Sequence, residues 1–147
     1  MALVVIDAAS TYGIKPGDGK DYTEELQAAC IKASKVVDQE HDPCQLVLPP
    51  GPINHSQTLV VRGSSAGAPW LHGSYGDGFD LQSTKLVWKG SQDVLQFYGE
   101  SFNRGRIWDI AFDGQDKAGR NIHIGGNKFE DPAQLKASSG FRLQRLK

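Results

Sequence analysis

The chain has little cysteine, little net charge and no long hydrophobic run, and each of these absences excludes a class of protein. Two cysteines among 147 residues cannot form the disulfide framework that holds many small secreted domains together. We expect Cys30 and Cys44 to be buried thiols, with a single disulfide between them as the alternative. A formal net charge of −1 provides no basic surface for nucleic acid.

No stretch approaches the ~20 apolar residues that span a bilayer, so no membrane association is expected. The first residues lead directly into a short apolar run, and no basic segment that would mark a signal peptide precedes it. Four dispersed histidines have no metal-ligand spacing, so the sequence predicts neither a metal site nor a cofactor.

A glycine-rich turn followed by a helical pattern occupies residues 13–29, and it has two interpretations. A phosphate-binding loop needs two glycines five residues apart, followed by Lys and then by Ser or Thr. If Gly19 and Lys20 end such a motif, the first glycine position holds Ile14 and the hydroxyl position holds Asp21. The Asp21 carboxylate would repel phosphate, so the sequence favours a structural turn.

The structural interpretation predicts one amphipathic helix over residues 22 to about 38. Proline and glycine at 16–19 are typical of a tight turn, and Asp21 is a suitable N-cap for the helix that follows. One helical stripe is apolar and consists of Leu26, Cys30, Ala33 and Val37.

Several short segments of this region resemble those of one protein family. They are Gly17-Asp18-Gly19, Asp21, Thr23, Gln27-Ala28-Ala29 and Leu46-Val47-Leu48-Pro49-Pro50-Gly51. In this order they resemble the start of the pectate-lyase-like right-handed parallel β-helices, which include pectate lyases, polygalacturonases, fungal glucanases and bacteriophage tailspikes. Pro52 and Ile53 stand where that family usually has an aromatic residue.

The resemblance covers roughly residues 4–125 and implies a mainly β fold. The expected architecture is a right-handed parallel β-helix of about three coils, whose N-terminal end is covered by a capping α-helix. Strands are expected at 46–48, 58–62, 84–88, 94–98, 106–112, 121–124 and 141–146, where β-branched and aromatic residues are frequent. Spacings of about 24 to 33 residues separate Leu59, Leu86, Ile110 and Leu143, which is within the range of solenoids.

We expect a single domain over residues 1–147, with a strand, turn and capping helix in 1–45 and coils in 46–147. Apolar and basic residues are mixed over 140–147, as in a further strand, and no capping element follows. An uncovered coil exposes strand edges. The chain is therefore expected to be incomplete at its C-terminus, as part of a longer parent chain, or to cover that end with partners in a homotrimer.

The segment 63–83 is interpreted as a long glycine-rich loop that carries aromatic and acidic residues. Trp70, Tyr75 and Asp77 lie in it, and Trp108 follows on a later strand. Flat sugar faces stack on aromatic rings and carboxylates accept hydroxyl hydrogen bonds, so these four residues are candidates for sugar binding. The alternative is that the aromatic side chains pack down onto the coil.

Carboxylates could serve catalysis, since glycosidases place two of them across the scissile bond. The candidates are Asp109, Asp113 and Asp116, and the alternative is that all three form turns. The alternation of residue types shifts phase at Asp109, which predicts a bend there with Ile107, Ile110 and Phe112 all facing inward. In the family that the chain resembles, catalytic groups lie further along the solenoid, and calcium would be expected only in a lyase.

Three functions are compatible with the sequence. The first is a phage tailspike-like or virion-associated protein that binds surface polysaccharide, with degradation of that polysaccharide as an additional activity compatible with the fold. The second is the N-terminal portion of a secreted polysaccharide lyase or glycoside hydrolase, and the third is a non-catalytic structural β-helix in an assembly. All three imply a virion or extracellular location.

Overall fold

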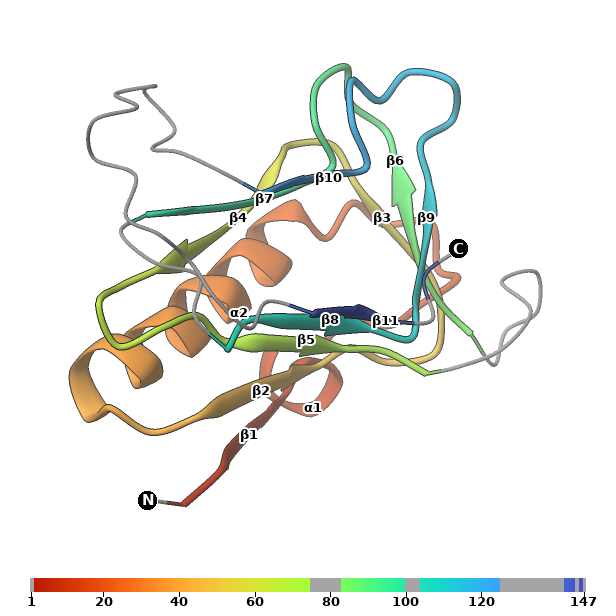
Figure 1. The fold of residues 1–147 in the computed structure, drawn as a ribbon. Helices are drawn as coiled ribbons and strands as arrows, with labels where there is room; N and C mark the ends of the chain where they lie inside the picture. Colours follow the sequence, from red (N-terminus) through yellow and green to blue (C-terminus); the bar gives the residue numbers. More distant parts are fainter. Residues whose placement is uncertain (1, 75–82, 100–103, 125–141, 145, 147) are drawn as a thin grey trace.

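A computed structural model describes residues 2–74, 83–99, 104–124, 142–144 and 146 of the chain. These residues form mostly short strands, all paired in parallel, and one long helix near the N-terminus (Figure 1). The mainly β class predicted from the sequence is therefore confirmed.

The described strands form three parallel sheets, which lie like the sides of a triangle in Figure 1. The five-stranded sheet contains, in order, β1 (Val4–Asp7), β2 (Cys44–Val47), β5 (Trp70–His72), β8 (Arg106–Trp108) and β11 (Arg142–Gln144). The second sheet contains β3 (Gly51–His55), β6 (Thr84–Trp88) and β9 (Ile110–Asp113). The third contains β10 (Ile122–Ile124), β7 (Leu95–Gly99) and β4 (Leu59–Gly63). From β2 onward the chain visits the three sheets in turn.

The core consists of aliphatic and aromatic side chains that stack from strand to strand. In the five-stranded sheet Leu46, Leu71 and Ile107 occupy paired positions, and all three are buried. The other two sheets contribute further stacked pairs in the same way: Ile53 with Leu86, Leu59 with Leu95, and Val61 with Phe97. Because side chains alternate along a strand, the residues between these positions face outward.

Three helical segments precede the coils: α1 (Ala8–Tyr12), α2 (Thr23–Lys35) and the π-helical η1 (Val36–Glu40). The predicted amphipathic helix is confirmed as α2 with η1. The structure places its N-cap at Tyr22, so the assignment of Asp21 to this position was wrong by one residue. Asp21 instead accepts hydrogen bonds from the Thr23 backbone at 2.9 Å and from the Thr23 hydroxyl at 2.6 Å. Helix α1 was not predicted.

Helix α2 covers the outer edge of β4 and pairs with its backbone through side chains. The Val60 N–H donates to Gln27 Oε1 at 2.9 Å, and Gln27 Nε2 donates to the Val60 carbonyl at 3.0 Å. Further along the same edge, the Arg62 N–H donates to Ser34 Oγ at 3.2 Å. Helix α2 thus supplies hydrogen-bond partners to backbone groups of β4 that would otherwise be unpaired at the sheet edge.

The glycine turn covers the outer edge of β3 in a similar way. Backbone N–H groups of Gly17 and Tyr22 donate to the carbonyls of Pro52 and Asn54, at 2.9 and 2.8 Å. The Thr23 hydroxyl accepts from the backbone N–H of Ser56 at 2.8 Å. These contacts assign the turn a structural role.

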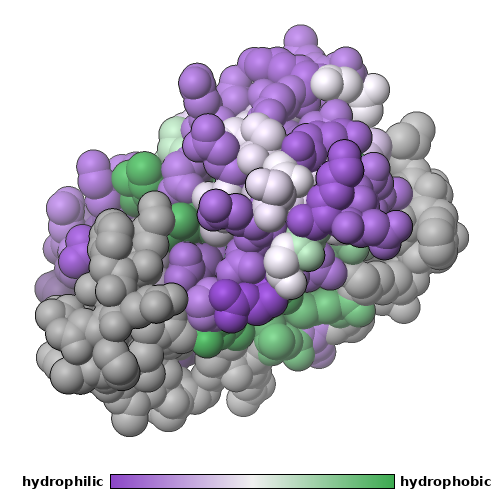
Figure 2. Space-filling model, turned by 90° about the horizontal axis from the view of Figure 1, so that it is seen from above, coloured by the Kyte–Doolittle hydropathy of each residue, from purple (hydrophilic) through white to green (hydrophobic). Residues whose placement is uncertain are grey.

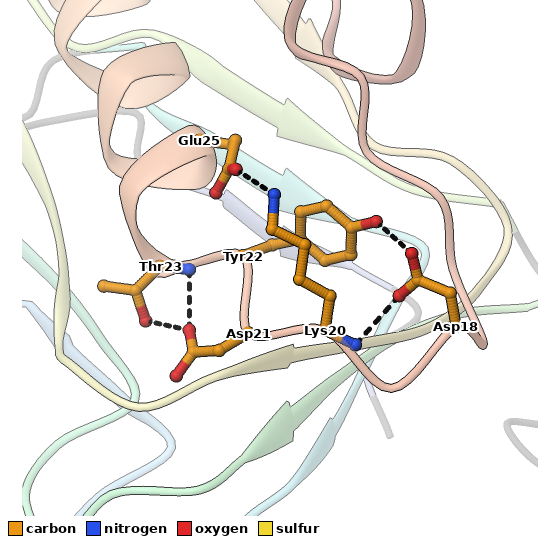
Figure 3. A network of polar contacts seen from close by, with 6 residues as sticks. All are labelled: Asp18, Lys20, Asp21, Tyr22, Thr23 and Glu25. Atoms are coloured by element: carbon orange, nitrogen blue, oxygen red, sulfur yellow. Dashed lines mark hydrogen bonds and ion pairs between the residues drawn. The ribbon is translucent and has the colours of Figure 1, made fainter.

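Polar side chains within the turn hold its shape (Figure 3). The Tyr22 hydroxyl donates to Asp18 at 2.5 Å, and this bond lowers the pKa of Asp18. Lys20 pairs with Glu25 at 2.6 Å. Because the Lys20 side chain is exposed, we expect this ion pair to contribute little to stability.

Several strand predictions are corrected by the structure. Strand β3 was not predicted, because Pro52 is unusual in a strand. Trp70 belongs to β5, so the interpretation of 63–83 as one long loop was wrong. Leu59 pairs with Leu95 and not with Leu86, so the proposed spacing from Leu59 to Leu86 joined positions in different sheets. Leu86 and Ile110, the next pair in that spacing, do lie in the same sheet. The bend at Asp109 is confirmed, since this residue separates β8 from β9 with a φ of 59°.

Cys30 and Cys44 are buried free thiols, as expected. Burial raises the pKa of Cys30 to about 12 and that of Cys44 to about 11. Both thiols are therefore protonated at neutral pH and act as small apolar groups in the core.

The face seen from above in Figure 2 is mostly hydrophilic over the described residues, with only small hydrophobic areas. A large apolar patch, which would mark a protein interface, is not visible on it. In the part of the chain that the structure describes, no helix has the length and apolar character needed to cross a membrane.

A test of edge pairing compares Gln27→Ala with Lys32→Ala on the same helix. Removal of the amide leaves the N–H and carbonyl of Val60 without partners, so we expect a loss of about 1–3 kcal/mol in the free energy of unfolding. Urea denaturation measures it. Lys32 is exposed, and its replacement should change stability by less than about 0.5 kcal/mol. Equal effects of the two substitutions would contradict the pairing.

A second test concerns His55, which is fully buried and lies edge-to-face on Trp88 with ring centroids 5.1 Å apart. Burial lowers the pKa of His55 below its ordinary value of 6.5. Since the unfolded chain binds this proton more readily, the free energy of unfolding should fall as the pH drops below about 6.5.

The measurement is urea denaturation of the wild type and of His55→Phe at pH 7.5, 6.5 and 5.5. The wild type should lose more stability over this range, by up to about 1.4 kcal/mol per pH unit. The control is His41→Asn, because His41 is exposed and has a φ of 57° that Asn also tolerates. Parallel pH profiles for the wild type and His55→Phe would exclude His55 as the cause.

Candidate functional site

Strands β5 and β8 carry aromatic and basic side chains on the outer face of the five-stranded sheet. In each strand the central residue, Leu71 or Ile107, is buried, and its two neighbours are partly exposed. The neighbours are Trp70 and His72 on β5, and Arg106 and Trp108 on β8. We call these four residues the aromatic-basic face.

Parallel pairing brings the four side chains into contact. Trp70 is paired with Arg106 and His72 with Trp108. The Arg106 guanidinium carbon lies 4.8 Å from the centroid of the Trp70 ring, and the His72 and Trp108 rings stack with centroids 4.6 Å apart. The two indole rings are 6.1 Å apart at an angle of 55°. The result is a continuous layer of flat groups across two strands.

Hydrogen bonds fix the orientation of the rings. Gln45 on β2 places its amide nitrogen 2.7 Å from His72 Nδ1, and His72 Nε2 lies 3.2 Å from an Asp109 carboxylate oxygen. Since an amide nitrogen can only donate, Nδ1 of His72 accepts and Nε2 carries the proton that is donated to Asp109. The Trp70 ring N–H donates to the carbonyl of Arg104 at 2.6 Å.

These bonds determine what the aromatic-basic face can do chemically. General acid–base catalysis needs a nitrogen within reach of the substrate. Both ring nitrogens of His72 have protein partners, which hold the ring in a fixed position. The arrangement is therefore suited to binding.

Asp109 lies at the bend between β8 and β9 and is buried. The bend passes close to the turn after β5, where Gly73 lies. A Cβ at Gly73 would be 2.3 Å from the Asp109 carbonyl oxygen, a distance that no side chain tolerates. The lack of a side chain at this position therefore lets the two turns stack and places Asp109 beside His72.

Of the other two candidate carboxylates, Asp113 is the last residue of β9 and Asp116 lies in the turn that follows. Asp113 accepts hydrogen bonds from the backbone and side chain of Gln115, at 3.1 and 2.8 Å. Asp116 is exposed and has a φ of 54°. These contacts are typical of turn-forming residues, and a catalytic role for Asp109, Asp113 and Asp116 stays a prediction.

Of the four residues predicted to bind sugar, the structure brings Trp70 and Trp108 together, whereas Tyr75 and Asp77 lie outside the described residues. Sequence reasoning missed Gln45, His72 and Arg106. A signal for two of them was present. The tripeptides 70–72 and 106–108 both have an aliphatic residue between two aromatic or basic residues, a pattern typical of strands with one outward face.

The described residues contain no group of three or more His, Cys, Asp or Glu side chains that could hold a metal ion. Comparisons of the chain with protein-family models, with curated proteins and with solved structures found no match. The function of the aromatic-basic face is therefore inferred from its own geometry.

The stacking of the two turns can be tested with Gly73→Ala. The added methyl group meets the Asp109 backbone and the Thr84 side chain, so we expect a loss of about 1–3 kcal/mol in the free energy of unfolding. Urea denaturation monitored by tryptophan fluorescence reports both stability and the environment of Trp70 and Trp108. Ser64→Ala, in the turn after β4, is the control. An unchanged midpoint for Gly73→Ala would contradict the close approach.

Proposed function

We propose that the chain is a right-handed parallel β-helix of a tailspike-like or virion-associated protein, and that its aromatic-basic face binds surface polysaccharide. The observation that carries the binding proposal is the contact between Trp70, Trp108, His72 and Arg106 on one outer sheet face. The tailspike-like assignment, the location on a virion and assembly as a homotrimer or within a longer parent chain rest on the resemblance of the N-terminal segments.

The order in which strands enter the sheets supports a β-helix. Each of β5, β6 and β7 pairs in parallel with the strand three positions earlier, and β8, β9 and β10 repeat this pattern. One turn of a solenoid contributes one strand to each sheet in this way. Connections between parallel strands are almost always right-handed, which favours the right-handed form.

The geometry of the aromatic-basic face supports sugar as the ligand. A pyranose ring has a flat face of C–H groups that packs on an indole, and hydroxyl groups at its rim that need hydrogen-bond partners. Trp70 and Trp108 supply the flat groups, and Arg106 supplies donors. Because neighbouring residues fix Trp70 and His72, little side-chain freedom is lost on binding.

The same geometry favours binding over hydrolysis on this face. A secreted lyase or glycoside hydrolase, the second candidate, needs a proton-transfer group that reaches the substrate. Both ring nitrogens of His72 are instead engaged by protein partners, Gln45 and Asp109. A purely structural β-helix, the third candidate, would not need a stacked layer of tryptophans on an outer face.

The experiment is affinity electrophoresis of the purified chain against a panel of bacterial capsular and lipopolysaccharide O-antigen polysaccharides. We expect Trp108→Ala to weaken binding by at least about tenfold, equivalent to about 1.4 kcal/mol. Tyr98→Ala is the matched control, because Tyr98 is a partly exposed aromatic residue on β7 in another sheet. Circular dichroism checks that the variants are folded.

Each result distinguishes among the candidates. Loss of binding in Trp108→Ala alone supports the proposal. Equal losses in Trp108→Ala and Tyr98→Ala, or no binding to any polysaccharide, would exclude the aromatic-basic face as the binding site. Release of reducing ends or unsaturated products by the wild type would favour the enzyme.

A further inference from the structure

We propose that the aromatic-basic face selects polysaccharides that carry carboxylate or sulfate groups, and that Arg106 binds the anionic group. The inference rests on the proposed function and adds the class of sugar. It is argued from the position and the unmet hydrogen-bonding capacity of the Arg106 guanidinium.

Arg106 is held by stacking and not by an acid. Its guanidinium carbon lies 4.8 Å from the centroid of the Trp70 ring, which is the geometry of a cation–π contact. Among the described residues, the ion pairs are formed by Lys20, His72, Arg120 and His123 with their carboxylates, and none involves Arg106. The charge of Arg106 is therefore uncompensated in the part of the chain that the structure describes.

One nitrogen of Arg106 also lacks a hydrogen-bond partner. Its Nε is buried and forms no hydrogen bond. A buried donor without an acceptor costs about 1–3 kcal/mol, and a shift of the side chain that brought Nε to a ligand oxygen would recover that cost. The guanidinium fork accommodates two oxygens of a carboxylate or sulfate at once, which a single sugar hydroxyl cannot reproduce.

The neighbouring acid forms an ion pair with His72. Asp109 is buried, and its carboxylate accepts a hydrogen bond from His72 Nε2 at 3.2 Å, whereas no ion pair between Asp109 and Arg106 occurs among the described residues. Trp70 is held in place by its own hydrogen bond to the Arg104 carbonyl, which keeps the indole under the guanidinium. A flat ring and a fixed cation together match an acidic sugar residue.

The test uses the full chain and pairs of polymers that differ only in charge. The pairs are dextran with carboxymethyl-dextran, dextran with dextran sulfate, and carboxyl-reduced hyaluronan with hyaluronan. Affinity electrophoresis at low salt should show the anionic member bound at least about tenfold more tightly, and the advantage should shrink in 0.5 M NaCl because the salt screens exposed charges. The carboxymethyl and sulfate arms identify which anionic group is preferred.

The variants are Arg106→Gln, Arg106→Lys and the control Arg62→Gln. Arg62 is an exposed arginine on β4, in a different sheet. We expect Arg106→Gln to remove the preference for the anionic polymer while the remaining binding still depends on Trp108. Arg106→Lys keeps the charge without the fork and should retain only part of the preference. Circular dichroism confirms folding, and at least one of the two Arg106 variants should be folded as the wild type is.

The outcomes separate this inference from the proposed function. Equal binding of neutral and anionic polymers that still depends on Trp108 would overturn the inference and leave polysaccharide binding intact. Equal losses in Arg62→Gln and Arg106→Gln would show attraction to overall charge and would also overturn it. If no polymer binds in a Trp108-dependent manner, the proposed function itself fails.

Discussion

The structure depends on one constraint, which is that the backbone N–H and carbonyl groups at a strand edge must find partners. The segments that precede β2 meet this requirement in all three sheets, each in a different way. Strand β1 pairs with β2, the glycine turn donates to the carbonyls of β3, and the side chains of α2 pair with β4. With one side of β2, β3 and β4 covered, the other side of each pairs with β5, β6 or β7, and later strands repeat this pairing.

The same repetition produces the candidate site. Parallel pairing places a residue of one strand directly beside its partner on the next, so side chains far apart in sequence meet on the outer face. Trp70 meets Arg106, and His72 meets Trp108, only because β5 and β8 pair in this register. A shift of β8 by one residue would turn Arg106 and Trp108 toward the core and expose Ile107. The stability of the core and the integrity of the aromatic-basic face are thus set by the same register.

The features that could be predicted from the sequence are local ones. Helix α2 follows from an apolar stripe, most strands follow from residue composition, and the bend at Asp109 follows from a change in alternation. Strand β3 was missed because it contains Pro52, which an edge strand accepts since the ring nitrogen can face away from β6. Strand β5 was missed because it is short and lies in a glycine-rich segment. Trp70 and Trp108 were identified because they are aromatic. To identify Gln45, His72 and Arg106, one must know which residues pair between neighbouring strands. This register depends on the lengths of the connections, which the sequence pattern does not encode.

The amide of Gln27 imitates the peptide group of a missing neighbouring strand, and this has a consequence for how the chain can vary in length. Each residue added to or removed from a helix rotates everything after it by about 100° around the axis. An insertion or deletion between Thr23 and Gln27 would therefore turn the amide away from Val60 and uncover the edge of β4. Surface connections between later strands tolerate such changes far better. Evolution of this protein should accordingly preserve the length of the first helical turns while the loops further along lengthen and shorten.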